Sequence, residues 1–354
     1  MKKKILIIIP KINNDGPVKG AFALANSLFK KKFNVSIIIV KKSNSHSKHL
    51  NKKIDLIFLK NNIIKNIFLY RSYLNELHKK KYKIYTISFC FEADFVNSFS
   101  PNNVFTICSM RANIFDNYKF QYNLFGYPLA LMHYFFIRNM NTIVSMHRPM
   151  SNQIKKYYSG NVKIVHNFID EEYLNKFSSI KDGRKNKNLI FVGLLNKRKN
   201  PNLIIDAVHK LVIQKNILKL DIVGDGDLKT ELEQKVIEMK LEKYITFHGH
   251  LENPYKLIKK ADILLLPSYS EGTSRALLEA LHFGLTCIIR NIDGAIELRG
   301  SSNNVLLFKK NEEFTDKIKL ALKKNKKNFL QRKSLIPLEF RQNYCVNKYI
   351  ELLK

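Results

Sequence analysis

Two glutamates eight positions apart, Glu271 and Glu279, are the residues of this chain best suited to chemistry. They follow the apolar run 261–267, which has the pattern of a buried strand. A carboxylate in a strand-to-helix loop, followed by another about two turns into the helix, puts two hydrogen-bond acceptors beside free backbone N–H groups that favour an anion. Such a site could hold phosphate and hydroxyl groups together, as a nucleotide-sugar requires. Paired glutamates are also common on solvated helix faces, so the rest of the chain must decide.

A cationic loop lies upstream of the glutamates. The apolar run 189–192 leads into three consecutive cations, Lys197, Arg198 and Lys199, just before a predicted helix. Lysine ammonium and arginine guanidinium groups at a strand end suit a diphosphate. The alternative is a solvated basic turn in a basic protein.

Two glycine turns follow the next predicted strands. The run 219–223 ends in Gly224-Asp-Gly226, which lacks the third glycine of a dinucleotide fingerprint. Close backbone approach to a ligand and a tight turn alone both explain it. Gly249 lies in a similar loop, where backbone groups could meet a base edge.

The elements that must position these residues alternate between short apolar runs and helical patterns, which predicts parallel sheets with crossover helices. We therefore expect an α/β protein with two Rossmann-like domains facing across a cleft, ligands at the carboxyl ends of the strands, and closing helices. The predicted strands are 5–9, 35–40, 54–59, 84–89, 104–107, 142–145, 162–165, 189–192, 219–223, 245–247, 263–266 and 286–289. The predicted helices are 21–32, 67–80, 150–158, 200–212, 228–239, 254–259 and the helix carrying Glu279.

The domain boundaries follow from a polar, charged stretch near the middle of the chain. We expect an acceptor-side domain over 1–176, a linker over 177–188 and a donor-binding domain over 189–329. Residues 330–354 mix basic and apolar side chains at helical spacing, and we expect closing helices that pack back toward the first domain.

The charge balance is strongly basic and narrows the possible partners. Lys and Arg number 61 against 29 Asp and Glu, a net charge of +32 over 354 residues, which predicts attraction to nucleic acid, an anionic membrane or phosphorylated substrates. Compositional bias toward Lys, Ile and Asn is the alternative explanation. The four cysteines lack the spacing of a zinc or redox site, and no apolar run is long enough to cross a membrane. A reducing cytoplasm is the simplest setting.

These features together resemble the family 4 retaining glycosyltransferases, which have the GT-B fold. The resemblance rests on the order of Gly193…Lys199, Val223-Gly-Asp-Gly226, Phe247-x-Gly249, Ala261-Asp262…Pro267-Ser268 and Glu271-x7-Glu279. It is strong over 189–308 and weaker in the first half.

The resemblance implies specific roles. Glu271 would hold hydroxyls of the donor sugar near the anomeric carbon, and Glu279 the ribose hydroxyls of the nucleotide. Lys199 would neutralise the leaving diphosphate. The remaining donor-binding residues would be Gly16 in the loop after the first strand, the glycines Gly224 and Gly249, and Thr273, Ser274 and Arg275 at the helix N-terminus.

Two departures from the family pattern bear on the catalytic set. Leu194 replaces the usual diphosphate arginine, which leaves the second cation to Arg198 or Lys197. Arg111 stands about where many members have a histidine, and we treat it as a catalytic candidate. The resemblance further implies front-face attack by the acceptor hydroxyl, no metal, and no cofactor besides a nucleotide-diphosphate-sugar co-substrate, a UDP-sugar in the first instance.

The resemblance implies a hexosyl- or N-acetylhexosaminyltransferase of cell-surface polysaccharide assembly (capsule, O-antigen or lipopolysaccharide), acting on a glycan or lipid-linked acceptor. A cytoplasmic enzyme peripheral on the inner face of the cell membrane fits the charge. The basic amphipathic segment 62–83 could lie on an anionic bilayer. The aromatic segment 120–136 could touch lipid too, although we expect it to be packed within the protein.

Two other functions compete with this prediction. A nucleic-acid-binding protein would fit the charge, but the sequence lacks aromatic RNA-binding, zinc-finger and helix-turn-helix signatures. A degenerate transferase acting as a partner subunit would fit Leu194 and Arg111.

Overall fold

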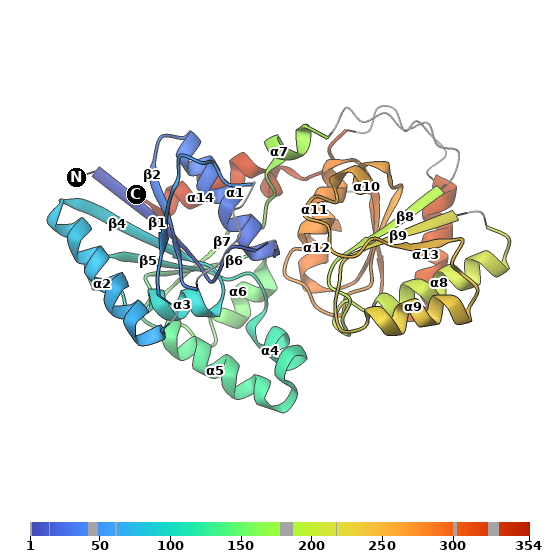
Figure 1. Cartoon of the computed structure of the whole chain (residues 1–354), viewed down its shortest axis with the longest axis horizontal. Coiled ribbons are helices and arrows are strands. Elements are labelled where there is room, and N and C mark those ends of the chain that lie inside the picture. Colours follow the sequence, from blue (N-terminus) through green and yellow to red (C-terminus); the bar gives the residue numbers. More distant parts are fainter. Residues whose placement is uncertain are drawn as a thin grey trace. The chain divides into compact units, whose positions relative to one another are not determined.

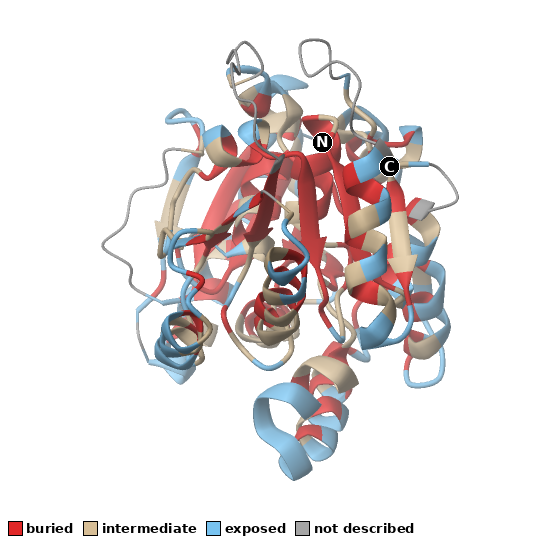
Figure 2. Ribbon diagram, turned by 90° about the vertical axis from the view of Figure 1, so that its right-hand side faces the viewer, coloured by how far each residue is buried: buried red, intermediate tan, exposed pale blue. Residues whose placement is uncertain are grey.

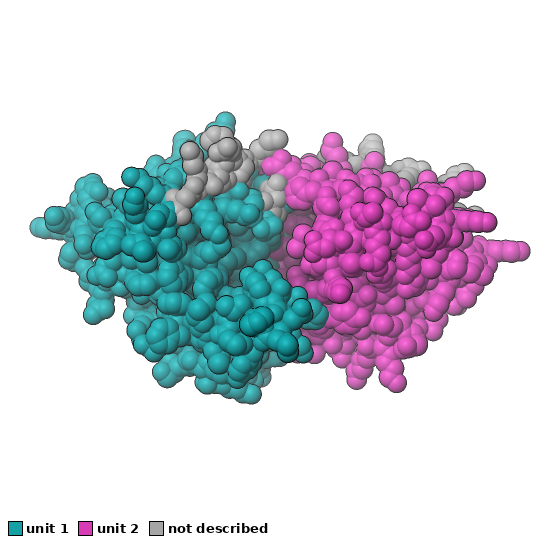
Figure 3. Space-filling view, turned by 60° about the horizontal axis from the view of Figure 1, so that its bottom comes forward, with its two compact units in different colours: residues 1–170, 339–354 teal, residues 171–338 magenta. Residues whose placement is uncertain are grey.

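The computed structural model describes residues 2–13, 15–41, 49–60, 62–177, 187–216, 218–299, 303–324 and 333–354. The chain divides into two compact units, unit 1 (Met1–Asp170 and Glu339–Lys354) and unit 2 (Glu171–Leu338), coloured separately in Figure 3. Each unit is built around one parallel sheet, so the α/β prediction is confirmed.

The sheet of unit 1 has seven strands in the order β3-β2-β1-β4-β5-β6-β7. Its central strands are buried on both faces, as expected of apolar runs in a parallel sheet. The strands are β1 (Lys2–Ile9), β2 (Asn34–Ile39), β3 (Asp55–Phe58), β4 (Tyr82–Ser88), β5 (Phe105–Ser109), β6 (Thr142–Ser145) and β7 (Asn161–Ile164).

Two helical layers cover this sheet. From β3 to β7 the chain crosses the sheet in one direction, and right-handed crossovers place the connecting helices on one face. The connection from β1 to β2 runs in the opposite direction, so α1 lies on the other face. The helices of the first face are α2 (Ile63–Lys79), α3 (Phe91–Asn97), α4 (Ile114–Tyr122), the 3-10 turn η1 (Asn123–Phe125), α5 (Gly126–Ile137) and α6 (Arg148–Ile154) (Figure 1). The opposite layer holds α1 (Gly16–Lys30) and the C-terminal α14 (Gln342–Leu352), which contact each other.

Unit 2 has six parallel strands in the order β10-β9-β8-β11-β12-β13. They are β8 (Lys187–Val192), β9 (Leu218–Val223), β10 (Ile245–Phe247), β11 (Ile263–Leu266), β12 (Thr286–Arg290) and β13 (Val305–Phe308). The helices are α7 (Glu171–Asn175), α8 (Pro201–Ile213), α9 (Lys229–Glu238), α10 (Tyr255–Lys260), α11 (Arg275–His282), α12 (Asp293–Arg299) and α13 (Asn311–Lys324), and the 3-10 turn η3 (Leu338–Phe340) precedes α14.

The unit boundaries differ from the expected 176/189 and 329/330. Unit 2 begins at Glu171, because α7 packs on α11 and Tyr173 contacts the Tyr255 ring edge-on. Within the predicted linker 177–188, residues 178–186 lie outside the described residues, and 187–188 form the first part of β8. The chain rejoins unit 1 only at Glu339.

The C-terminal helix is bound to unit 1 by buried contacts. The Tyr349 hydroxyl hydrogen-bonds the Ser109 hydroxyl at 2.6 Å, and the Gln342 side chain donates to the Ser27 hydroxyl. Residues from the two ends of the chain thus share one hydrophobic core.

Candidate functional site

The strand order of unit 2 places the cationic loop and the first glutamate side by side. β8 and β11 are neighbours at the centre of the sheet, with β9 and β10 on one side and β12 and β13 on the other. Crossovers therefore diverge at this point, where loops separate and ligands of open α/β sheets usually bind. Lys199 follows β8 and Glu271 follows β11, although 72 positions separate them in sequence.

Glu271 forms the centre of a charged triad with the two cations. Lys199 Nζ donates a hydrogen bond to Glu271 Oε1, and Arg198 Nη1 lies 3.5 Å from Glu271 Oε2. The side chains of Lys199 and Glu271 are only 11% and 12% exposed, so this pair is largely removed from water. Lys197, the third cation of the loop, is exposed.

Burial by itself raises the pKa of Glu271, since it penalises the charged carboxylate. The charges of Lys199 and Arg198 outweigh this and hold its pKa below the usual range of a glutamate. The site therefore presents an ionised carboxylate beside two cations at neutral pH. Cations can neutralise a diphosphate, while the carboxylate can accept hydrogen bonds from sugar hydroxyls.

Hydrogen bonds to backbone carbonyls hold the two loops against each other. Arg198 Nη1 donates to the carbonyl oxygen of Ser270 at 2.7 Å, and the Tyr269 N–H donates to the carbonyl oxygen of Arg198 at 2.9 Å. Arg198 is thereby fixed from both its main chain and its side chain. A pre-positioned guanidinium needs little reorganisation to meet a developing negative charge.

The helix α11 begins beside this triad. Ser274 is its N-cap residue, with extended backbone, and Thr273 before it is buried. Glu279 lies one turn after Arg275 and is itself buried, with Arg275 Nη2 3.7 Å from Glu279 Oε1. The apolar face of α11 fixes the helix on the sheet, so Glu271, the first-turn amides and Glu279 are held in one region of unit 2.

The glycine turns pack against the cationic loop. A Cβ on Gly224 would lie 1.8 Å from the carbonyl oxygen of Gly193, and one on Gly226 would lie 2.5 Å from that of Leu195. These glycines therefore allow the loop after β9 to approach the backbone of the cationic loop closely. Gly193 N–H donates to Val223 O in the same contact.

Gly249 completes this edge of the sheet. Its carbonyl oxygen accepts a hydrogen bond from the Gly224 N–H at 2.8 Å, which links the loops after β9 and β10. Its φ of +63° favours glycine, and the space where a Cβ would stand is open. Gly224 thus packs against the cationic loop and supports it, whereas the backbone of Gly249 has open space beside it.

Two further residues shape the loop that carries Glu271, and sequence reasoning missed both roles. Arg290, at the end of β12, donates from Nε to the Pro267 carbonyl at 3.1 Å and lies 4.5 Å from the Tyr269 ring. Gly294 in α12 meets the same loop, because a Cβ there would lie 1.4 Å from Gly272 O. The sequence did contain a signal for Arg290, because a cation at the end of an apolar strand indicates a position at the carboxyl edge of the sheet.

In unit 1, the structure places the two candidate residues after different strands. Gly16 is the first residue of α1, directly after the loop that follows β1. Arg111 follows β5, where Nη1 donates to Asn167 Oδ1 at 3.1 Å and the guanidinium lies 4.6 Å from the Phe89 ring centroid. Nη2 also lies 3.4 Å from the Tyr349 hydroxyl, so Arg111 joins the last helix to the carboxyl edge of its sheet.

No group of three or more potential metal ligands occurs among the described His, Cys, Asp and Glu residues. None of the described helices has the length and apolarity needed to cross a bilayer.

Comparison with known proteins gives a family match that contains the site. Residues 173–334, nearly all of unit 2, match the model for glycosyl transferases group 1. The chain is 33% identical over 186 residues to a Campylobacter jejuni protein, GalNAc-alpha-(1->4)-GalNAc-alpha-(1->3)-diNAcBac-PP-undecaprenol alpha-1,4-N-acetyl-D-galactosaminyltransferase, covering 51% of this chain and 50% of the relative. It is 36% identical over 118 residues to an Escherichia coli UDP-Gal:alpha-D-GlcNAc-diphosphoundecaprenol alpha-1,3-galactosyltransferase, covering 32% and 30%. The aligned region spans half or less of each of these relatives.

Solved structures extend the likeness to both units. Anabaena Alr3699/HepE in complex with UDP-glucose superposes with a TM-score of 0.77 at 15% identity, over 99% of each chain. The apo lipopolysaccharide outer core galactosyltransferase WaaB gives a TM-score of 0.73 at 14% identity, also over 99% of each. The expected GT-B fold is therefore confirmed for the whole chain.

Proposed function

We propose that the chain is a retaining glycosyltransferase that moves a hexosyl or N-acetylhexosaminyl group from a UDP-sugar to a glycan or lipid-linked acceptor in cell-surface polysaccharide assembly. The observation that carries the proposal is the largely buried triad of Glu271, Lys199 and Arg198, at the point where the crossovers of the unit 2 sheet diverge. The match of residues 173–334 to glycosyl transferases group 1, and relatives whose names specify undecaprenol-linked saccharides, support it.

In this proposal the donor replaces ion pairs that already exist. Its diphosphate takes Lys199 and Arg198 as counter-charges, which frees the oxygens of Glu271 for hydroxyls of the donor sugar. Amides at the start of α11 add donors for the phosphates, and Glu279 accepts from the ribose. The charge of the departing diphosphate is thus met by groups that the fold has already oriented.

The bond changes are those of a simple substitution with retention. The glycosidic bond between the anomeric carbon and the phosphate oxygen breaks, and the acceptor hydroxyl oxygen bonds to the same face of that carbon. The acceptor's proton passes to the departing phosphate oxygen. No cofactor besides the nucleotide-sugar enters this scheme. Because the acceptors of the named relatives are lipid-linked, we place the protein peripherally on the inner face of the cell membrane.

The test is a transfer assay with a panel of UDP-sugars, including UDP-galactose and UDP-N-acetylgalactosamine, and undecaprenyl-diphosphate-linked saccharides as acceptors. A thermal-shift screen of nucleotide-sugars first selects the donor. The product should carry an α linkage, and Glu271→Gln should lower turnover by about 100-fold or more, as loss of a positioned transition-state contact does. The exposed Glu242→Gln serves as the matched control. Wild-type turnover in Glu271→Gln, or the absence of binding by any nucleotide-sugar, would overturn the proposal.

A further inference from the structure

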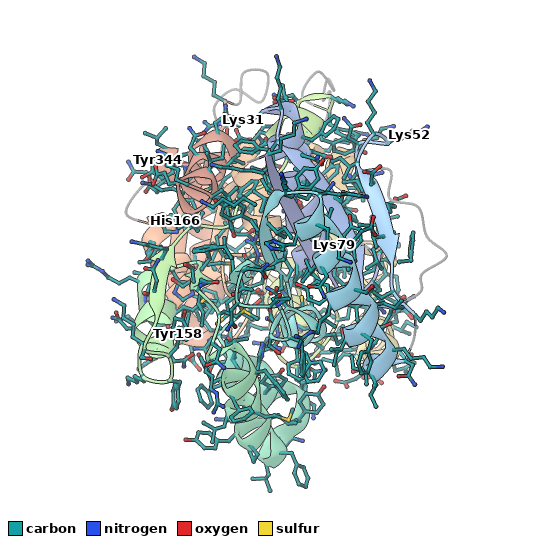
Figure 4. The ribbon with its side chains drawn as sticks, turned by 90° about the vertical axis from the view of Figure 1, so that its left-hand side faces the viewer. Lys31, Lys52, Lys79, Tyr158, His166 and Tyr344 are labelled. Carbon is teal, nitrogen blue, oxygen red and sulfur yellow. The ribbon has the colours of Figure 1, made fainter. Side chains whose placement is uncertain are left out.

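The α4–η1–α5 hairpin of unit 1 ends in an exposed apolar tip. Leu124 is 92% exposed and Phe125 is 77% exposed, the two highest values among the large hydrophobic side chains described. The tip, defined here by its exposed apolar side chains, consists of Phe120, Tyr122, Leu124, Phe125, Tyr127, Leu131, Met132 and Phe135. Figure 2 shows the exposed end of this hairpin, and Figure 4 shows rings extending from the helices. Exposed apolar side chains gathered on one hairpin in this way mark an interaction site.

The base of the same hairpin is anchored in the core. His133 Nε2 lies 3.1 Å from Asp94 Oδ2, and His133 Nδ1 lies 3.3 Å from the Tyr118 hydroxyl, all three residues being buried. Gly126 lets α5 begin against α4, because a Cβ there would lie 2.6 Å from the Tyr118 carbonyl. The tip is therefore presented by a fixed support, which contradicts our expectation that 120–136 is simply packed within the protein.

The charge around the tip selects its partner. Residues 117–169 contain no Asp or Glu, while their Lys and Arg residues are Lys119, Arg138, Arg148, Lys155, Lys156 and Lys163. Arg138 lies 3.9 Å from the ring centroid of Phe135, so a cation sits directly beside the apolar surface. The carboxylate of the hairpin, Asp116, lies in the first turn of α4, at the end of that helix away from the tip. Apolar side chains flanked by tyrosines and cations match the boundary of an anionic bilayer.

The segment that seemed the better lipid-binding candidate in sequence is a weaker one in the structure. On α2, Tyr70, Leu74 and Leu77 face the core, as in an ordinary amphipathic helix. Its outer face keeps Ile64 and Phe68 exposed, but Glu76 also lies there, paired with Lys80. α2 and α5 both contact α3 on the same face of the sheet.

We propose that the apolar tip of the α4–η1–α5 hairpin inserts into the head-group region of an anionic lipid bilayer and docks unit 1 on the membrane. The inference deepens the proposed function, since a lipid-linked acceptor lies at that surface. Leu124 and Phe125 enter the acyl boundary, Tyr122 and Tyr127 stay at head-group level, and the flanking cations meet lipid phosphates.

The test is co-sedimentation with phosphatidylcholine vesicles, with and without phosphatidylglycerol. Wild type should bind the anionic vesicles, and the double variant Leu124→Ser with Phe125→Ser should bind at least about tenfold more weakly, since each side chain contributes more than 1 kcal/mol when buried. The matched control, Ile213→Ser with Ile237→Ser, removes two exposed apolar side chains from unit 2 and should bind as wild type does. A second variant, Ile64→Ser with Phe68→Ser, tests α2.

A spectroscopic probe tests insertion directly, because the chain contains no tryptophan. Emission of Leu124→Trp should shift to the blue with anionic vesicles, whereas Ile237→Trp should not shift. Wild-type binding by the tip variant, loss of binding only in the α2 variant, or a tip that instead mediates concentration-dependent dimerisation would each overturn the proposal. UDP-sugar binding, measured alongside, separates this outcome from failure of the proposed function, since the tip variant should bind donor normally.

Discussion

The buried pair of Lys199 and Glu271 makes a quantitative prediction about stability. Lys199→Met leaves the Glu271 carboxylate in a site where its side chain is 12% exposed, with Arg198, 3.5 Å away, as the remaining counter-charge among the described residues. Removing one partner of a buried ion pair costs about 3–5 kcal/mol, and Arg198 should keep the cost near 3 kcal/mol. For a unit of this size the midpoint of thermal unfolding should fall by about 6–12 °C.

The double variant supplies the decisive comparison. Glu271→Gln alone strands two cations and should also destabilise, whereas Lys199→Met combined with Glu271→Gln removes both charges. We expect the double variant to recover most of the loss and to lie within about 1 kcal/mol of wild type, because a neutral pair needs no charge compensation. Scanning calorimetry on the four proteins of the cycle measures this. Additivity of the two single variants within about 0.5 kcal/mol would refute a direct ion pair.

Two further predictions follow from the same site. Because the folded-state pKa of Glu271 is lowered, its contribution to stability is present at neutral pH and is lost as the pH falls below about 4. The unfolding free energies of wild type and Glu271→Gln, measured by urea titration, should therefore converge in acid. A constant difference between them across pH would contradict the pKa shift. Gly224→Ala should disrupt the cationic loop and abolish UDP binding, since its Cβ would lie 1.8 Å from Gly193 O. Gly249→Ala has open space for its Cβ and should lower the free energy of unfolding by only about 1 kcal/mol, because of the positive φ. Equal effects of the two variants in calorimetry and UDP titration would contradict the packing described.

The sequence alone predicted most strands correctly, because a buried parallel strand is written as a local run of apolar residues. The runs 142–145, 245–247 and 263–266 match β6, β10 and β11 residue for residue. Helix starts were less predictable: α1 begins at Gly16, five residues before the expected start, since Gly and Pro17 fit a first turn that propensity disfavours. The elements that were not predicted are strand β13 and helices α3, α4, α5, α7, α12 and α13.

The chemical character of the site was also present in the sequence. The glutamate pair, the cationic loop and the glycine turns predict that unit 2 is the donor-binding half, because each motif is local and follows a strand. The resemblance to a known family then followed from their order.

Only the tertiary structure decided which of these residues meet. Lys199 and Glu271 are 72 positions apart, and their pairing depends on β8 and β11 being neighbours in the sheet. The same holds for Arg111, whose contacts to Asn167 and Tyr349 span 56 and 238 positions. The sequence also could not predict which apolar residues of 120–136 are exposed. These residues are similar in type, but those at the base of the hairpin are buried and those at its tip are exposed. Local patterns determine elements, whereas contacts and exposure depend on which surfaces the fold brings together or leaves uncovered.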